Sequence, residues 1–123
     1  MSSYIESTSD QISLMKNLKV DGPIAMVNLL KFKPDGGREQ YNKYIREAQP
    51  FLTKHGVRVT YIGDGYGETI GPPDEEWDCV LIAEYPNHQA YLDMTTEKSY
   101  PGDVRAAALV DSRNIITSPR RTY

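Results

Sequence analysis

The segment 24–32 constrains the fold more than any other part of the chain. Its sequence, Ile-Ala-Met-Val-Asn-Leu-Leu-Lys-Phe, is almost continuously apolar, and turn-forming Gly and Pro residues lie on both sides of it. It is too short for a typical helix and therefore predicts a β-strand that is buried on both faces. The segment 77–85 has the same character around Val80 and Ile82. Because both faces of these strands are largely apolar, each side of their sheet must be covered by another layer.

The remaining elements follow from residue spacing and turn signals. Apolar residues at helical spacing predict helices over about 9–19, 39–55, 88–96 and 102–109, while β-branched and aromatic runs predict strands over 58–62 and 110–117. Pro50 is expected to kink or break the second helix. After the first helix, the order is the βαββαβ pattern of ferredoxin-like α+β sandwiches. We expect one domain over 1–123, with its core at about 23–117 and a tail at 118–123.

A ferredoxin-like sheet carries helices on one face only, which leaves its second face uncovered. Met26 and Leu30 alternate with Val27 and Leu29 along the first strand, so this second face is apolar as well. The simplest cover for such a face is the same face of another copy. The sequence therefore predicts a homodimer that pairs through its sheet faces.

Composition and charge argue against several classes of protein. The formal net charge of −3 argues against nucleic acid as a partner, and no apolar run reaches the roughly 18 residues that span a membrane. The amino-terminal segment lacks the pattern of a signal peptide, and Cys79 is the only cysteine, so we expect a cytoplasmic protein with no internal disulfide. His55 and His88 fall at different helix ends. We therefore expect no metal and no cofactor.

Three polar residues within apolar surroundings are candidates for chemistry. Asn28 interrupts a hydrophobic strand, and it could orient a substrate or make a structural hydrogen bond. Glu84 could act as a general acid or base, or it could be exposed to water at a strand end or form an ion pair with Arg105 or Arg113. Arg105 is followed by three small alanines, so its guanidinium could reach inward and bind a carboxylate or enolate. Alternatively, Arg105 could form a salt bridge to Asp78, Asp103 or Asp111.

Tyrosines are unusually common, at nine against two phenylalanines. Tyrosine combines an apolar ring with a polar hydroxyl, which suits the wall of a pocket for a planar or aromatic ligand. We expect Tyr44, Tyr61 and Tyr100 to line such a pocket between sheet and helices, with Tyr41 and Tyr91 as further candidates. Other tyrosines are expected in the core or at the dimer interface.

Several segments together resemble a known bacterial family. They are Asp-Gly-Pro at 21–23 leading into Met-Val-Asn-Leu-Leu-Lys-Phe at 26–32, Ala-Glu-Tyr-Pro-Asn at 83–87, and Arg-Ala-Ala-Ala at 105–108 before Asp111-Ser112. Over roughly 23–117 the chain resembles the family called domain of unknown function 1330, in the dimeric α/β-barrel superfamily. The resemblance implies ferredoxin-like protomers packed sheet against sheet. It implies no single activity, because the superfamily includes cofactor-free monooxygenases, isomerases, cyclases, haem enzymes and simple binding proteins.

Two functions remain open at this point. One is a small-molecule pocket that carries out cofactor-free acid/base chemistry on a small carbonyl or aromatic compound. There, Arg105 and Asn28 would stabilise an oxyanion, while Glu84 or a tyrosine would move the proton. The other is a non-catalytic ligand-binding or stress-associated module. The state of the pocket distinguishes them, since side chains that bond only to protein favour the second function.

Overall fold

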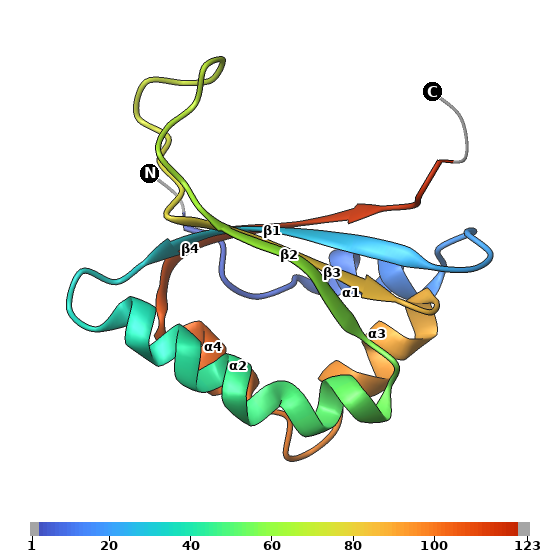
Figure 1. Cartoon of the computed structure of the whole chain (residues 1–123). Coiled ribbons are helices and arrows are strands. Elements are labelled where there is room, and N and C mark those ends of the chain that lie inside the picture. The colour runs from blue at the N-terminus through green and yellow to red at the C-terminus, as the bar shows by residue number, and fades with distance from the viewer. Residues whose placement is uncertain (1–2, 121–123) are drawn as a thin grey trace.

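The computed structural model describes residues 3–120, and over this range it consists of four helices and one four-stranded sheet (Figure 1). The strand order is β2-β3-β1-β4, with antiparallel pairing throughout. This confirms the predicted α+β class and the βαββαβ order that follows the first helix. The elements are α1 (Ser9–Lys16), β1 (Ile24–Phe32), α2 (Gly37–Lys54), β2 (Arg58–Asp64), β3 (Cys79–Tyr85), α3 (His88–Thr95), α4 (Gly102–Ala107) and β4 (Leu109–Thr117).

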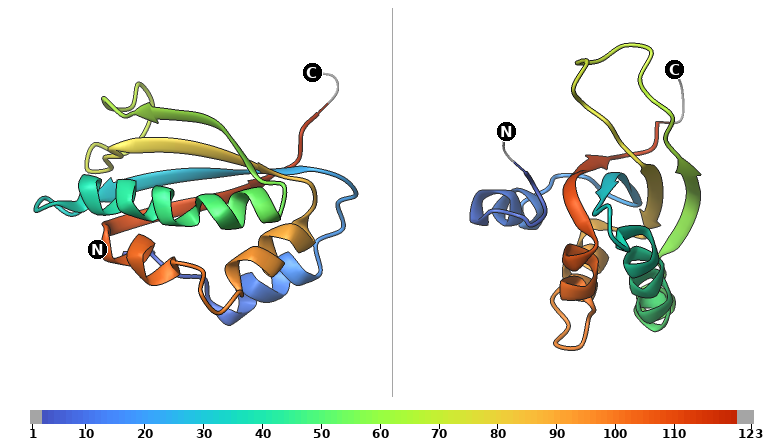
Figure 2. Two further views of the ribbon diagram at one scale, coloured as in Figure 1. Left: turned by 60° about the horizontal axis from the view of Figure 1, so that its bottom comes forward. Right: turned by 90° about the vertical axis from the view of Figure 1, so that its left-hand side faces the viewer.

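α2, α3 and α4 lie on one side of the sheet, and α1 lies beside its β4 edge (Figure 2). Figure 2 shows α2 and α4 next to each other under the sheet, with α1 beside α3. The loop that joins β2 to β3 rises on the other side (Figure 1). We call the side that carries the helices the helix side and the other side the open face.

Strand pairing decides which residues belong to each face. Met26, Asn28 and Leu30 of β1 are buried toward the helices, and Asn28 pairs with Leu81 of β3. Residues directly opposite each other in a pair point to the same face, and neighbours along a strand alternate. The open face therefore contains the apolar side chains of Val27, Leu29, Tyr61, Val80, Ile82 and Ile115.

Two predicted boundaries and one predicted interruption differ from the structure. α1 ends at Lys16 rather than near residue 19, and β3 begins at Cys79 rather than at residue 77. Pro50 lies inside α2 without breaking it into two pieces. The amide that Pro50 lacks would have bonded to the carbonyl of Arg46; both residues lie on the exposed side of the helix, where water can replace that bond.

The predicted tail at 118–123 lies partly outside the described residues, because it includes 121–123. Across residues 3–120, every helix is too short or too polar to cross a membrane.

Candidate functional site

Arg105 is the centre of the polar chemistry on the helix side. It lies on the short helix α4 and is partly buried between α2 and the sheet. Its Nη2 donates a hydrogen bond to Oδ1 of Asn28 across 3.1 Å. The two residues are 77 positions apart in the sequence, so the contact depends on the complete fold.

Asn28 is held in a fixed orientation by the sheet. Its Nδ2 donates to the carbonyl oxygens of Met26 at 3.3 Å and of Leu81 at 3.2 Å. Both amide hydrogens are thereby used, and Oδ1 is left facing Arg105. Asn28 thus positions the guanidinium, and its two amide hydrogens and its Oδ1 all have protein partners. Of the two possibilities for Asn28, the hydrogen bonds match the structural one.

Five tyrosines from four parts of the chain surround Arg105, and we call them the tyrosine cluster. Tyr44 and Tyr100 are hydrogen-bonded through their hydroxyls, and their rings meet edge to face. The ring of Tyr41 lies 5.3 Å from that of Tyr44, measured between centroids. On the α3 side, the rings of two further members lie 5.4 Å apart. The members are Tyr41 and Tyr44 of α2, Tyr85 of β3, Tyr91 of α3, and Tyr100 between α3 and α4.

Burial sets the charge state of this cluster. It raises the pKa of Tyr41, Tyr85, Tyr91 and Tyr100, so these phenols are neutral at pH 7. Burial alone would lower the pKa of Arg105, but the surrounding tyrosine hydroxyls outweigh it and the net shift is upward. The site therefore combines one permanent positive charge with several neutral hydroxyls.

Within residues 3–120, Arg105 forms no ion pair. Two of the three aspartates that were candidates for a salt bridge have other roles: Asp78 accepts a hydrogen bond from the Phe32 amide, and Asp111 pairs with Arg113. Removing a cation from water without a counter-ion has a large free-energy cost. An anion at this position would offset that cost.

Two predicted site residues lie elsewhere. Glu84 pairs with Arg58 at 2.8 Å, and the strand register places both on the open face. Tyr61 is on the open face as well, with its ring folded over Gly63. Their placement in a helix-side pocket was wrong, because alternation along β3 and β2 points them away from Asn28. The structure brings together Asn28, Tyr44, Tyr100 and Arg105.

One member of the cluster was missed from the sequence. Tyr85 lies on the same face of β3 as Leu81, and Leu81 pairs with Asn28. The alternation along segment 77–85 was the available signal, but it identifies the helix side only once the pairing of two strands is known.

The site offers no ligand set for a metal. In the part of the chain that the structure describes, no group of three or more His, Cys, Asp or Glu side chains comes together. Two shallow surface hollows of about 500 and 600 Å³ lie beside residues 3–8 and at the start of α2. Neither is lined by Arg105 or the tyrosine cluster. The chemistry on the helix side is therefore that of a guanidinium, an amide and phenols.

Fold and site together define a ferredoxin-like α+β protein. RPA0582, a protein of unknown function from Rhodopseudomonas palustris, is 33% identical, with 98% of this chain and 100% of that chain covered and a TM-score of 0.89. The chain described here belongs to the same family as RPA0582. Comparison with models of known protein families found no match, and comparison with curated proteins found none either.

More distant structures share the fold alone. A dimeric ferredoxin-like protein of unknown function from Jannaschia sp. CCS1 is 9% identical, with 80% of this chain and all of that chain covered and a TM-score of 0.58. SnoaB of Streptomyces nogalater, a cofactor-independent oxygenase, is 17% identical, with 82% and 96% covered and a TM-score of 0.55.

Proposed function

We propose that the protein binds a small organic anion on the helix side of its sheet, at Arg105. The observation that carries this proposal is a partly buried guanidinium without an acidic partner among the described residues. Arginine recognises carboxylates and enolates through two parallel N–H donors, and here only one of its terminal nitrogens is committed to Asn28. The tyrosine hydroxyls supply further donors, and their rings supply apolar walls.

The reaction that this arrangement favours is cofactor-free acid/base chemistry on a small carbonyl or aromatic compound. Arg105 would stabilise the oxyanion, in the way that fixed donors stabilise developing negative charge. Because Glu84 lies on the open face, proton transfer falls to the hydroxyl pair of Tyr44 and Tyr100. SnoaB supports the possibility through its fold, since its chemistry is described as cofactor-independent.

We place the entry of the ligand at the contact between Tyr44 and Tyr100. This contact joins α2 to the segment between α3 and α4, and it lies among residues that line Arg105. A ligand that reaches the guanidinium replaces the hydrogen bond between the two hydroxyls with bonds to itself. Ligand binding is therefore coupled to a small separation of these two elements.

Thermal unfolding in the presence of matched acids and amides tests the proposal. Formate, acetate and benzoate should raise the Tm of the wild-type protein in a saturable way, whereas formamide, acetamide and benzamide should not. Arg105→Met should remove the effect of the acids. Arg46→Met, which removes an exposed arginine from α2, is the matched control and should retain it. Equal responses to acids and amides, or an unchanged response in Arg105→Met, would contradict the proposal.

A structural role for Arg105, in a stress-associated or other module without chemistry of its own, is the second candidate, and the hydrogen bonding of Asn28 favours it. Both amide hydrogens and the oxygen of Asn28 have protein partners. In that case the contact between Arg105 and Asn28 would serve only to join α4 to the sheet. Arg105→Met would then unfold the protein at a much lower temperature and the acids would have no effect on the wild type.

We further propose that the chain is a cytoplasmic member of the bacterial family domain of unknown function 1330 and forms a homodimer through its open faces. The segments quoted above support the family, and the described dimer from Jannaschia sp. CCS1 supports pairing. The apolar open face, from Val27 and Leu29 to Val80 and Ile82, supports the choice of surface. Two such faces, packed together, form the dimeric α/β barrel.

A further inference from the structure

The loop between β2 and β3 carries the most exposed large apolar side chains of the described chain. We call residues 65–78 the β2–β3 arm. Tyr66 is 98% exposed and Ile70 is 93% exposed, whereas the other exposed large apolar side chains reach at most 57%. A loop of this length without secondary structure is uncommon in a small domain and is usually functional or disordered.

The base of the arm is fixed to β1, one of the two central strands of the sheet. The amide of Gly65 donates to the carbonyl of Asp78 at 2.9 Å, and the amide of Asp78 donates to the carbonyl of Leu30 at 2.8 Å. A Cβ atom on Gly65 would lie 2.0 Å from the Trp77 carbonyl oxygen, so the two sides of the base are in close contact. The arm is therefore anchored at its base to the sheet.

The arm stands on the same side of the sheet as the open face. Figures 1 and 2 both show it rising away from the helices. The arm projects from one end of the sheet, on the side of the apolar open face. Tyr66 and Ile70 lie on the arm, and no neighbouring side chains cover them.

We propose that the β2–β3 arm clasps a second copy of this chain, with Tyr66 and Ile70 packed against the partner when two open faces meet. The inference rests on the pairing of open faces proposed above. In a two-fold dimer each protomer both supplies an arm and receives one, so the apolar contact is made twice. This would bury the two most exposed large apolar side chains that the described structure contains.

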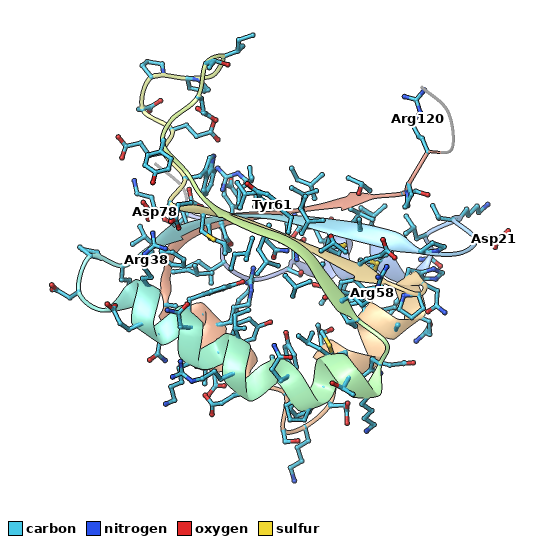
Figure 3. The ribbon with its side chains drawn as sticks, viewed as in Figure 1. Asp21, Arg38, Arg58, Tyr61, Asp78 and Arg120 are labelled. Carbon is cyan, nitrogen blue, oxygen red and sulfur yellow. The ribbon has the colours of Figure 1, made fainter. Side chains whose placement is uncertain are left out.

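Charge supports a second copy as the occupant. The arm is acidic, while the segment after β4 carries Arg120 on the same side of the sheet and at its opposite end (Figure 3). A two-fold axis across the strands brings the arm of one protomer to the carboxyl-terminal segment of the other. Opposite charges then face each other at both ends of the interface. The acidic residues of the arm are Glu68, Asp74, Glu75, Glu76 and, at its base, Asp78.

Sedimentation equilibrium of the full chain tests the proposal. The wild type should be a dimer at micromolar concentration. Tyr66→Ser combined with Ile70→Ser should weaken self-association about tenfold or more, as the loss of two interface side chains does. Leu14→Ser is the matched control, because Leu14 is 57% exposed on α1, a helix that contacts α3 and lies far along the chain from the arm. This control should dimerise like the wild type, and circular dichroism should show that all three proteins are folded.

The outcomes separate the arm from the pairing on which it rests. If the double variant dimerises as tightly as the wild type, the arm does not contribute and the inference is overturned, while pairing through the open faces stands. If the wild type is monomeric at micromolar concentration, pairing itself fails and the arm must serve another partner. If Leu14→Ser weakens the dimer as much as the double variant, the effect is not specific to the arm and the inference is again overturned.

Discussion

At the scale of single residues, the arginine on the helix side needs the most explanation. Arg105 could be replaced by an apolar residue at less cost in desolvation, because replacing buried ionic groups by apolar ones is often neutral or stabilising. Its hydrogen bond to Asn28 satisfies one donor group and leaves others. An anionic ligand accounts for the charge, and the amide of Asn28 accounts for its orientation.

The buried tyrosines predict how the protein responds to alkali. Their pKa values are raised in the folded state, so above their ordinary value of 10 the unfolded chain loses these protons more readily than the folded chain. The contribution of these tyrosines to the free energy of unfolding should therefore stay constant below about pH 10, and it should decrease as the pH rises further. Absorbance at about 295 nm, followed together with circular dichroism, should show Tyr41, Tyr85, Tyr91 and Tyr100 ionising only as the chain unfolds. Ionisation of all nine tyrosines in a chain that is still folded would contradict this.

Residue type predicted part of the site, and strand register decided the rest. Asn28 and Arg105 stood out because a polar side chain within apolar sequence requires a partner, and they are partners of each other. Glu84 and Tyr61 were equally conspicuous by type. Whether a residue of β2 or β3 faces the helices depends on which residue it pairs with on the neighbouring strand, and that pairing is not readable from either strand alone.

At the scale of elements, α2 and the segment between α3 and α4 form a continuous seam. Glu97 accepts hydrogen bonds from Lys54 at 2.7 Å and from His55 at 2.5 Å, and these bonds lower the pKa of its carboxyl. Farther along α2, Phe51 and Tyr100 meet edge to face with 5.7 Å between ring centroids. The seam then reaches the tyrosine cluster, so polar contacts at one end and aromatic contacts at the other hold Tyr100 over the site.

Two adjacent glycines at the start of α2 allow a matched test of how this helix packs. A Cβ on Gly37 would lie 2.7 Å from the carbonyl oxygen of Ala108, whereas a Cβ on Gly36 meets nothing but requires a left-handed backbone, with φ of 79°. Gly36→Ala should therefore destabilise the protein by about 1 kcal/mol, and Gly37→Ala by about 3 kcal/mol because backbone must move.

Urea unfolding of both glycine variants against the wild type measures this difference directly. If Gly37→Ala is no more destabilising than Gly36→Ala, the close contact between α2 and the end of α4 is not a constraint on the fold.

Local pattern predicted most of the elements, because each has a strong period or a clear turn at its ends. α3 begins after Asn87, whose side chain accepts a hydrogen bond from the Ala90 amide, as expected of a helix cap. The exception was Pro50, where the expected break depends on whether the freed carbonyl meets water or protein. That distinction depends on which side of α2 faces the core.

At the scale of the whole molecule, the two faces of the sheet have separate roles. The helix side holds the only cluster of mutually contacting tyrosines around an arginine in the described chain, and the open face holds an apolar surface with the arm at its edge. Sequence alternation predicted that both faces are apolar. It could not predict the arm's position, because nothing in its glycine- and proline-rich sequence says on which side of the sheet it stands.

The central claim is that Arg105 is an anion site, and nuclear magnetic resonance of the arginine side chains tests it most directly. The Nε–Hε signals of a ¹⁵N-labelled protein are followed during titration with sodium benzoate, and the Arg105 signal is assigned by its absence in Arg105→Met. The account predicts that the Arg105 signal shifts first and saturates, and that benzamide leaves it in place. Shifts confined to exposed arginines such as Arg38 and Arg58, with Arg105 unmoved, would contradict the account.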